Sequence, residues 1–385
     1  MTIHWDKKPL KEVATIIGGS TPKTNINEFW GGNQFWVAPA ELNGNKYISS
    51  TVKTITEQAV KKTHLTLLPT GTVLLSSRAP IGKVAITTVP MYCNQGFKNV
   101  VCGEYLHNEY VYYYLKHNIN YLQSLGTGAT FKEISKKVVE DILIPVPPIN
   151  IQKEIASELD LLSSIIEKKN EQLKILDKLA ESIFYEIFGD SISNEKGWPV
   201  NNLGTLCNSE LGKMLDSKRA KGTNKPYLCT INVLWDKIDL STVKEMPFED
   251  EELERYSIKK GDLLICEGGD TGRAAIWDRD DTIYYQNSIH RVRFDKEKML
   301  PQYFLYILKL YKQQGVLNNY SSGQTIKHLV KKSLLSIPVP TPPIEIQHVF
   351  AQKLDIIKRN RHIIECSLRD AQQLLASRMD KYFSE

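Results

Sequence analysis

Side chains suited to hydrogen bonding with DNA bases occur in loops at equivalent places in the two halves of the chain. Arg and Lys pair with guanine, and Asn and Gln pair with adenine, when they stand on a loop that can enter the major groove. Asn94 and Gln95 in the first half correspond to Gln286 and Asn287 in the second. The sequence therefore predicts base contacts at these loops, with a solvated turn as the simpler alternative for each.

Two kinds of DNA contact are expected. The Gly-rich loops 18–23 and 212–219 suit phosphates, through backbone NH groups and basic side chains, whereas the other loops suit base edges. Glu267 and Asp270 carry the wrong charge for phosphate, so they either accept a hydrogen bond from cytosine N4 or orient Arg273. The predicted DNA-binding residues are Ser20, Thr21, Lys23, Ser77, Arg78, Lys83, Asn94, Gln95, Thr130, Lys132, Lys213, Lys218, Arg219, Arg273, Asn287, His290, Arg291, Gln324, Thr325 and Lys327.

The sequence lacks motifs that would hold a reacting cofactor. It has no Gly-x-x-x-x-Gly-Lys-Ser/Thr phosphate loop, no Asn/Asp-Pro-Pro-Tyr/Phe adenine-methylating motif and no Phe-x-Gly-x-Gly turn. The Pro pairs at 147–148 and 342–343 suit helix starts instead. The six cysteines form no Cys-x-x-Cys pair, which favours free thiols over metal ligands. We expect no catalytic residue, metal or cofactor in this chain.

An internal repeat determines where the loops must lie. Residues 126–160 align without a gap with 321–355, at a shift of 195. In that match Gly128 meets Gly323 and Gln152 meets Gln347. An earlier stretch aligns at a smaller shift, which indicates loop insertions. The chain is therefore predicted to contain two copies of one unit of about 190 residues.

Each copy is predicted to begin with a mixed α/β domain. Short β-branched runs broken by Gly, Pro or Asn indicate strands. Helices are expected at 108–118 and 301–311, where aromatic residues recur at helical spacing. Such stripes can stack bases, but they more often form core, and we assign them to the core. The runs predicted as strands are 71–75, 83–87, 99–102, 261–265 and 290–294.

Each copy is predicted to end in a long helix. Apolar residues alternate steps of four and three from Ile155 to Ile187, and the pattern recurs from Phe350 to Tyr382. This heptad spacing predicts two coiled-coil helices, each roughly 60 Å long for about 40 residues. We expect them to pack antiparallel, with one globular domain at each end. The predicted segments are globular domains at 1–145 and 191–340 and helices at 146–190 and 341–385.

Apolar residues outside the first seam form a second stripe on the first helix. Two interpretations stay open: the stripe docks a partner protein, or it packs against the globular domains. Its members are Leu161, Ile165, Ile175 and Phe184.

Composition and charge exclude other classes of protein. With 42% apolar and 24% charged residues the chain is globular, and no stretch of about 20 apolar residues is present to span a bilayer. The first ten residues contain no signal-peptide core, so we expect a cytoplasmic protein. The net charge is +5 for 1–145, −4 for 146–190, +3 for 191–340 and +1 for 341–385. Two basic domains fit a DNA duplex with two half-sites, and an acidic first helix favours a protein partner.

Several phrases of the sequence are distinctive when they occur together. They are GGSTPKTNINEFWGGNQFWVAPAEL at 18–42, LGKMLDSKRAKG at 211–222, YLCTINVLWDKIDLSTVKEM at 227–246, and the paired phrases IPVPPINIQKEI and IPVPTPPIEIQHVF. With the repeat and the length, they make the chain resemble the specificity subunit of type I restriction-modification systems over essentially its whole length.

The resemblance implies two target recognition domains, each reading one half of a split DNA sequence, and helices that bind two modification subunits. It implies that those methyltransferase subunits carry S-adenosylmethionine and methylate adenine N6. Motor-nuclease restriction subunits of the full complex would use ATP and Mg²⁺ to translocate and cleave DNA. The chain itself would be a non-catalytic recognition subunit.

Two alternatives need no modification subunit. A stand-alone bipartite DNA-binding regulator would have the same domains and helices, without exposed apolar surface on the helices. A protein-interaction scaffold would need no base-reading loops.

Overall fold

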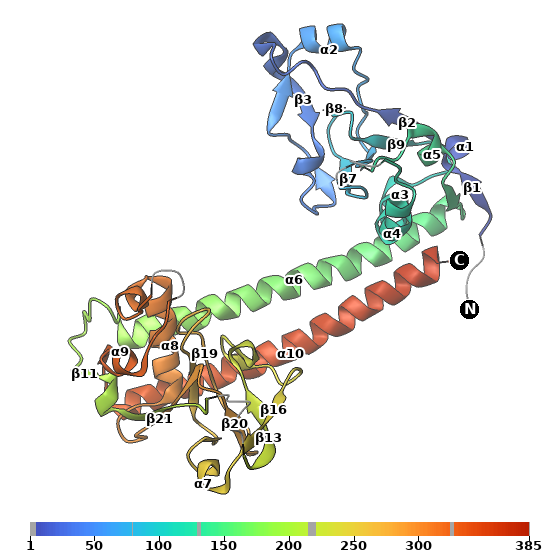
Figure 1. Ribbon diagram of the computed structural model, residues 1–385. Helices are drawn as coiled ribbons and strands as arrows, with labels where there is room; N and C mark the ends of the chain where they lie inside the picture. Colours follow the sequence, from blue (N-terminus) through green and yellow to red (C-terminus); the bar gives the residue numbers. More distant parts are fainter. Residues whose placement is uncertain (1–4, 79, 129–131, 215–220, 324–326, 385) are drawn as a thin grey trace. The chain divides into compact units, whose positions relative to one another are not determined.

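The computed structural model describes residues 5–78, 80–128, 132–214, 221–323 and 327–384 (Figure 1). The chain divides into two compact units. The first contains the residues up to Glu171 and those from Ile364 onward, and the second contains Gln172–Ile363. Each unit holds one globular domain and a stretch of each of two long helices.

The globular domain of the first unit is built on two sheets. A five-stranded sheet has the order β2-β9-β6-β7-β4, and a three-stranded sheet has the order β5-β3-β8. Short helices complete the domain: α1 (Leu10–Val13), α2 (Glu57–Thr63), α3 (Asn108–His117), α4 (Ile119–Ser124) and α5 (Lys136–Glu140). The strands are β2 (Ala14–Gly18), β3 (Trp30–Val37), β4 (Tyr47–Ile48), β5 (Lys53–Ile55), β6 (Val73–Leu75), β7 (Val84–Thr87), β8 (Tyr92–Cys93) and β9 (Lys98–Cys102).

The five-stranded sheet is buried on both faces, which explains its uninterrupted apolar runs. Because side chains alternate along a strand, Val73 and Leu75 of β6 pack with Tyr110 of α3. Leu74 lies in a second core with Val37 of β3. The aromatic stripe of α3 therefore belongs to the core, as the sequence predicted.

The second unit repeats this plan. Its sheets have the orders β12-β21-β18-β19 and β16-β13-β20-β17, with a β14-β15 hairpin beside β19. Leu263 and Ile265 of β18 pack with Tyr303 and Phe304, and Leu264 faces the other core. The elements are α7 (Asp250–Leu253), α8 (Pro301–Gln313), α9 (Lys331–Leu335), β12 (Cys207–Leu211), β13 (Thr223–Leu228), β14 (Val233–Leu234), β15 (Lys237–Ile238), β16 (Lys244–Phe248), β17 (Ser257–Ile258), β18 (Leu263–Cys266), β19 (Ala274–Ile276), β20 (Ile283–Tyr285) and β21 (Ile289–Phe294).

A buried glutamine fixes the start of each long helix. In the helix α6 (Ile149–Phe188), the Gln152 amide donates to the carbonyls of Pro147 and Tyr105, both at 2.8 Å, and accepts from the backbone N–H of His107 at 2.9 Å. In α10 (Ile344–Phe383), Gln347 makes the matching bonds to Pro342, Lys298 and Leu300. The repeat therefore preserves the junction between domain and helix, where each buried amide is satisfied.

A two-stranded ribbon closes each domain next to its long helix. In the first unit β1 (Lys7–Pro9) pairs antiparallel with β10 (Leu143–Pro145), and in the second β11 (Val200–Asn202) pairs with β22 (Pro338–Pro340). A tyrosine hydroxyl from the neighbouring helix donates to the last residue of each ribbon. Tyr110 bonds the Pro145 carbonyl at 3.1 Å, and Tyr303 bonds that of Pro340 at 2.9 Å. The two ends of each domain therefore lie side by side.

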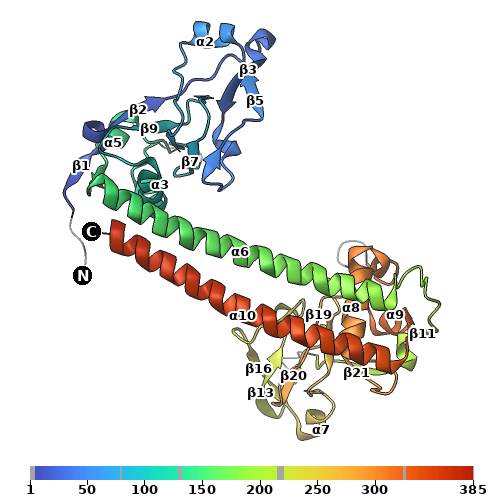
Figure 2. The ribbon, with the colours of Figure 1, turned by 180° about the vertical axis from the view of Figure 1, so that it is seen from behind.

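The two long helices pack antiparallel in each unit. In the first unit Glu158 of α6 pairs with Arg378 of α10 at 2.9 Å and accepts from the Tyr382 hydroxyl. In the second unit Asp177 of α6 pairs with Arg361 of α10. Figures 1 and 2 show the first turns of α6 beside the last turns of α10. The predicted fold class is confirmed: mixed α/β, with two similar domains joined by two long antiparallel helices.

The second apolar stripe of α6 proves to be divided. Phe184 is buried and stacks against Tyr303 and Tyr306 of the second domain, so packing against a domain explains it. Leu161 and Ile175 are exposed and stay available to a partner. In the described part of the chain, no helix is both long and apolar enough to cross a membrane.

Candidate nucleic-acid interface

Five loops of the first domain are joined by backbone hydrogen bonds into one cluster. Ser20 N–H donates to Cys93 O at 3.0 Å, and Asn94 N–H donates to Val37 O at 2.9 Å. The Ile134 N–H donates to the Ser77 carbonyl at 2.9 Å, and this bond joins the fifth loop to the others. We call this the first loop cluster; it comprises the described residues of 18–23, 37–41, 76–83, 93–97 and 127–134.

The second domain has the same bonds between the corresponding loops. Lys213 N–H donates to Tyr285 O at 3.0 Å, and Gln286 N–H donates to Leu228 O at 3.1 Å. Glu267 occupies the position of Ser77 and accepts from Leu329 N–H at 2.8 Å. The second loop cluster comprises the described residues of 211–214, 228–232, 266–273, 285–290 and 322–329.

A glycine permits the tightest approach in each cluster. A Cβ on Gly19 would lie 2.2 Å from Asn94 O and 2.3 Å from Cys93 O, and one on Gly212 would lie 2.3 Å from Gln286 O. Backbone carbonyls cannot yield as a flexible side chain can, so only glycine fits these two positions. The Gly-rich loops therefore serve first to let two loops meet.

We expect Gly19→Ala to lower the free energy of unfolding by about 1–3 kcal/mol, the usual cost of overpacking. Because the first loop cluster would be displaced, recognition by the first domain should fall as well. Gly18→Ala is the matched control, since its Cβ would meet no atom closer than 3.9 Å. Thermal unfolding and DNA binding of both variants test this; equal behaviour of the two would contradict it.

Thr21, Asn94 and Gln95 form a polar group on the first loop cluster. Asn94 Nδ2 donates to Thr21 Oγ1 at 2.8 Å, and the Thr21 hydroxyl donates to Gln95 Oε1. Gln95 is exposed, and its Nε2 remains available to donate outward. Such a fixed amide is suited to hydrogen bonding with a base edge; base contact by Asn94 and Gln95, and phosphate contact by the loop of Thr21, stay predictions.

Several predicted basic contacts are held by the protein itself. Lys83 Nζ donates to Pro39 O at 3.3 Å, and the equivalent Arg273 donates to Thr230 O at 2.6 Å. Both carbonyls belong to a short 3₁₀ turn in the adjacent loop. Lys213 is likewise bound, to Glu252 and to Pro247 O. These cations position loops, a role that the sequence analysis did not assign to them.

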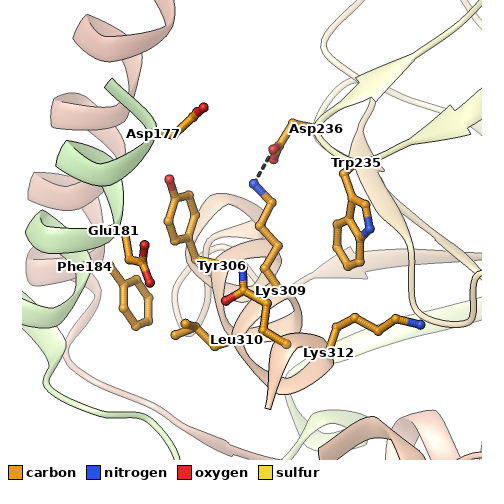
Figure 3. A pocket seen from close by; sticks show the side chains of 10 residues that line it. Asp177, Glu181, Phe184, Trp235, Asp236, Tyr306, Lys309, Leu310 and Lys312 are labelled. Atoms are coloured by element: carbon orange, nitrogen blue, oxygen red, sulfur yellow. Dashed lines mark hydrogen bonds and ion pairs between the residues drawn. The ribbon is translucent and has the colours of Figure 1, made fainter. Parts of the chain in front are cut away.

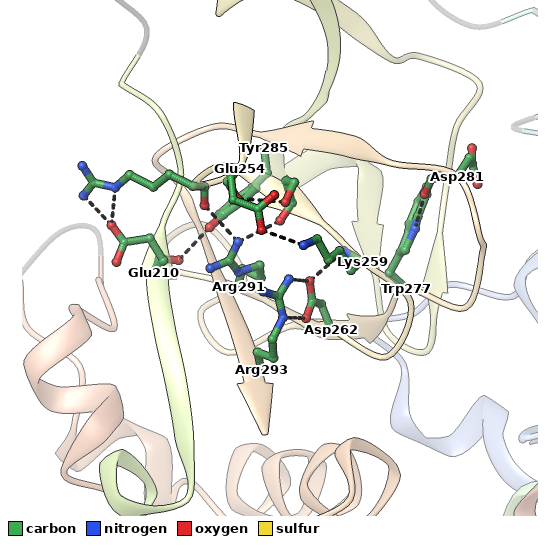
Figure 4. Close-up of polar contacts among 11 residues, drawn as sticks. Glu210, Glu254, Lys259, Asp262, Trp277, Asp281, Tyr285, Arg291 and Arg293 are labelled. Atoms are coloured by element: carbon green, nitrogen blue, oxygen red, sulfur yellow. Dashed lines mark hydrogen bonds and ion pairs between the residues drawn. The ribbon is translucent and has the colours of Figure 1, made fainter. Parts of the chain in front are cut away.

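His290, Arg291 and Ser77 are buried. His290 Nε2 lies 2.8 Å from Leu329 O, and burial lowers the pKa of its imidazole. Arg291 Nη1 donates to the carbonyls of Arg255 and Ser257 (Figure 4). As placed, these side chains stabilise the domains and present almost no surface to DNA.

The acidic residues of the second loop cluster have different surroundings. Asp270 pairs with Lys312 at 2.8 Å, while the Arg273 guanidinium donates to the Thr230 carbonyl. Glu267 is half-buried, and burial raises the pKa of its carboxyl. Of the two, Glu267 is the better placed to accept from a base.

The remaining predicted residues divide by exposure. The exposed ones are Lys23, Lys132 and Lys327, and the half-buried ones are Ser20, Arg78 and Asn287. The Lys327 amine donates a hydrogen bond to Asn318 Oδ1 at 2.7 Å. Sequence reasoning missed Lys98, the first residue of β9, which directly follows the loop 93–97 and pairs with Glu133 at 3.1 Å. The predicted contacts Thr130, Lys218, Arg219, Gln324 and Thr325 lie outside the described residues.

A model of the type I restriction modification DNA specificity domain matches the chain twice, over residues 3–175 and 195–370. The MjaIX specificity subunit of Methanocaldococcus jannaschii is 29% identical over 95% of this chain and 91% of its own length. The EcoKI specificity subunit of Escherichia coli K12 is 22% identical over 95% of this chain and 85% of its own length. The solved S subunit from M. genitalium, at 17% identity and a TM-score of 0.60, covers 100% of this chain and 97% of that one.

The chain therefore belongs to the type I restriction-modification DNA specificity family. It is a specificity subunit with two target recognition domains, one in each unit, and is the non-catalytic component of its system.

Proposed function

We propose that each globular domain reads one half of a bipartite double-stranded DNA target, while the two long helices space the domains and dock two modification subunits. One observation carries the first part. The two loop clusters share one set of backbone hydrogen bonds but hold different side chains. A common frame with different side chains is what two related domains need to recognise two different sequences.

The differences fall at the positions best placed for recognition. Asn94 and Gln95 of the first loop cluster correspond to Gln286 and Asn287 of the second, which also has the half-buried carboxylate of Glu267. These side chains offer different donors and acceptors to the major groove, in which each base pair has its own pattern. The two half-sites should therefore differ, so that the target is not a palindrome.

An exposed apolar ridge supports the docking of a protein on α10. Val349, Ile356 and Ile363 are 47%, 56% and 64% exposed. Their spacing of seven residues, close to two helical turns, places them on one side of the helix. Exposed apolar patches of this kind mark protein interfaces. We call these three residues the α10 ridge.

The chemistry in this proposal belongs to the partner subunits. The modification subunits supply S-adenosylmethionine and methylate adenine N6, and the motor-nuclease subunits supply ATP-dependent cleavage with Mg²⁺. This chain contributes the sequence read and the distance between half-sites, and it binds no cofactor of its own. These assignments rest on the family to which the chain belongs.

Methylome sequencing of cells that produce this chain with its modification subunits tests the proposal. We expect methylated adenines in two unlike half-sites at one fixed spacing. The pure chain with S-adenosylmethionine alone should leave DNA unmethylated. A single continuous site, or two identical half-sites, would refute the proposal that two different domains each recognise one half of a bipartite target.

A further inference from the structure

The second unit contains a pocket of about 310 Å³ between the end of α6, the helix α8 and the turn that joins β14 to β15. Figure 3 shows Glu181 and Trp235 on opposite sides of it, with Tyr306 and Lys309 between them. The pocket lies beside the long helix, and its wall touches the second loop cluster through Lys312, which pairs with Asp270 and donates to Thr271 O.

Most charges of the pocket wall are neutralised within the unit. Asp236 pairs with Lys309, and Asp177 pairs with Arg361. Lys312 pairs with Asp270 at 2.8 Å. Glu181 is exposed and has neither an ion pair nor a hydrogen bond to any residue that the structure describes. The pocket thus has one uncompensated negative charge.

Aromatic rings form the rest of the binding surface. Tyr306 stacks on Phe184 with ring centroids 5.6 Å apart, and Lys309 Nζ lies 4.9 Å from the centroid of Tyr306. Trp235 is half-buried on the opposite side. A flat ring and an unpaired carboxylate together favour an arginine, whose stem packs on the ring while its guanidinium forks onto the carboxylate.

In the first unit, a carboxylate of the long helix beside a similar surface is paired with a lysine of the same chain. Lys46, next to β4 at the corresponding sheet edge, pairs with Asp160 of α6 at 2.5 Å. Its Nζ lies 5.1 Å from the ring of Tyr113, the repeat equivalent of Tyr306. The corresponding turn of the second unit has Trp235 and Asp236 and brings no cation to Glu181. In the second unit Lys309 occupies the place over Tyr306 that Lys46 occupies over Tyr113, and it pairs with Asp236, so Glu181 remains without a cation from the described chain.

We propose that this pocket receives an arginine side chain of a modification subunit, with its guanidinium on Glu181 and its stem against Trp235. The inference rests on the proposed docking of modification subunits and adds a specific contact to it. The net charge of −4 on 146–190 is complementary to such a partner.

Glu181→Arg tests the pocket, because it places a guanidinium of the chain where the partner's would bind. We expect the modification subunit to bind about tenfold more weakly, because the variant loses one charge-assisted hydrogen bond. Glu186→Arg is the matched control: it makes the same charge change at another exposed position of α6. Thermal unfolding of both variants should equal that of the parent chain. Isothermal titration with the purified modification subunit measures the affinities.

The outcomes separate this inference from the proposed function. If the parent chain binds and Glu181→Arg binds equally well, the pocket contact is refuted while docking stands. If the parent chain does not bind at all, the proposed function itself fails. Arg→Glu substitutions in the modification subunit complete the test: one of them should restore binding to Glu181→Arg, and failure of all of them would refute an arginine as the occupant.

Discussion

Replacing residues 1–145 with the corresponding domain of a related specificity subunit is expected to change one half of the methylated sequence entirely and leave the other half as it was. The domain has its own cores, and its first and last strands pair as Lys7 with Pro145. The exchange therefore joins two chain ends that already lie side by side. Methylome sequencing before and after the exchange reports both halves.

The exchanged domain must keep its contacts with the long helices. Phe383 of α10 packs on Tyr110 and Tyr114, with ring centroids 5.3 and 5.9 Å apart. A donor with aromatic residues at both tyrosine positions preserves this packing. The reciprocal exchange of 191–340 is the control, and it should change only the other half. A change in both halves after either exchange would show that the domains do not act separately.

Ile356→Asp combined with Ile363→Asp is expected to abolish stable binding of modification subunits, and with it DNA methylation. Each isoleucine loses about 1.5–3 kcal/mol of apolar burial, so the pair weakens binding by roughly a hundredfold or more. Both side chains are exposed in the chain alone, so its own unfolding temperature should hardly change. Sedimentation of the mixed subunits measures the loss.

Lys358→Asp is the control for this double variant. Lys358 is exposed on the same helix. It follows Ile356 by two residues, so its side chain points about 200° around the helix axis from the α10 ridge. It should bind modification subunits as the parent chain does. Normal binding by the double aspartate variant would exclude the α10 ridge as the docking surface.

Local sequence determined the elements and their repetition. Apolar runs such as Val73–Leu75 must be strands with two buried faces, and the heptad spacing after Pro148 must form a long helix, because periodicity depends only on backbone geometry. The match of Gln152 with Gln347 marked the two junctions, which the structure shows as identical hydrogen-bonded clamps. The division into segments at 145, 190 and 340 stays a prediction.

Only the tertiary structure decided what each polar side chain does. Lys83 and Arg273 have the residue type of DNA contacts, but each donates to a carbonyl from a loop some 40 residues away. His290 and Arg291 lie on β21, and both faces of that strand are covered. Phe184 is buried, unlike the exposed members of its stripe, because α8 packs against it. Spacing along the chain gives a side chain's direction within its own element. Its partner depends on which distant segment lies opposite, and long-range packing alone brings that segment there.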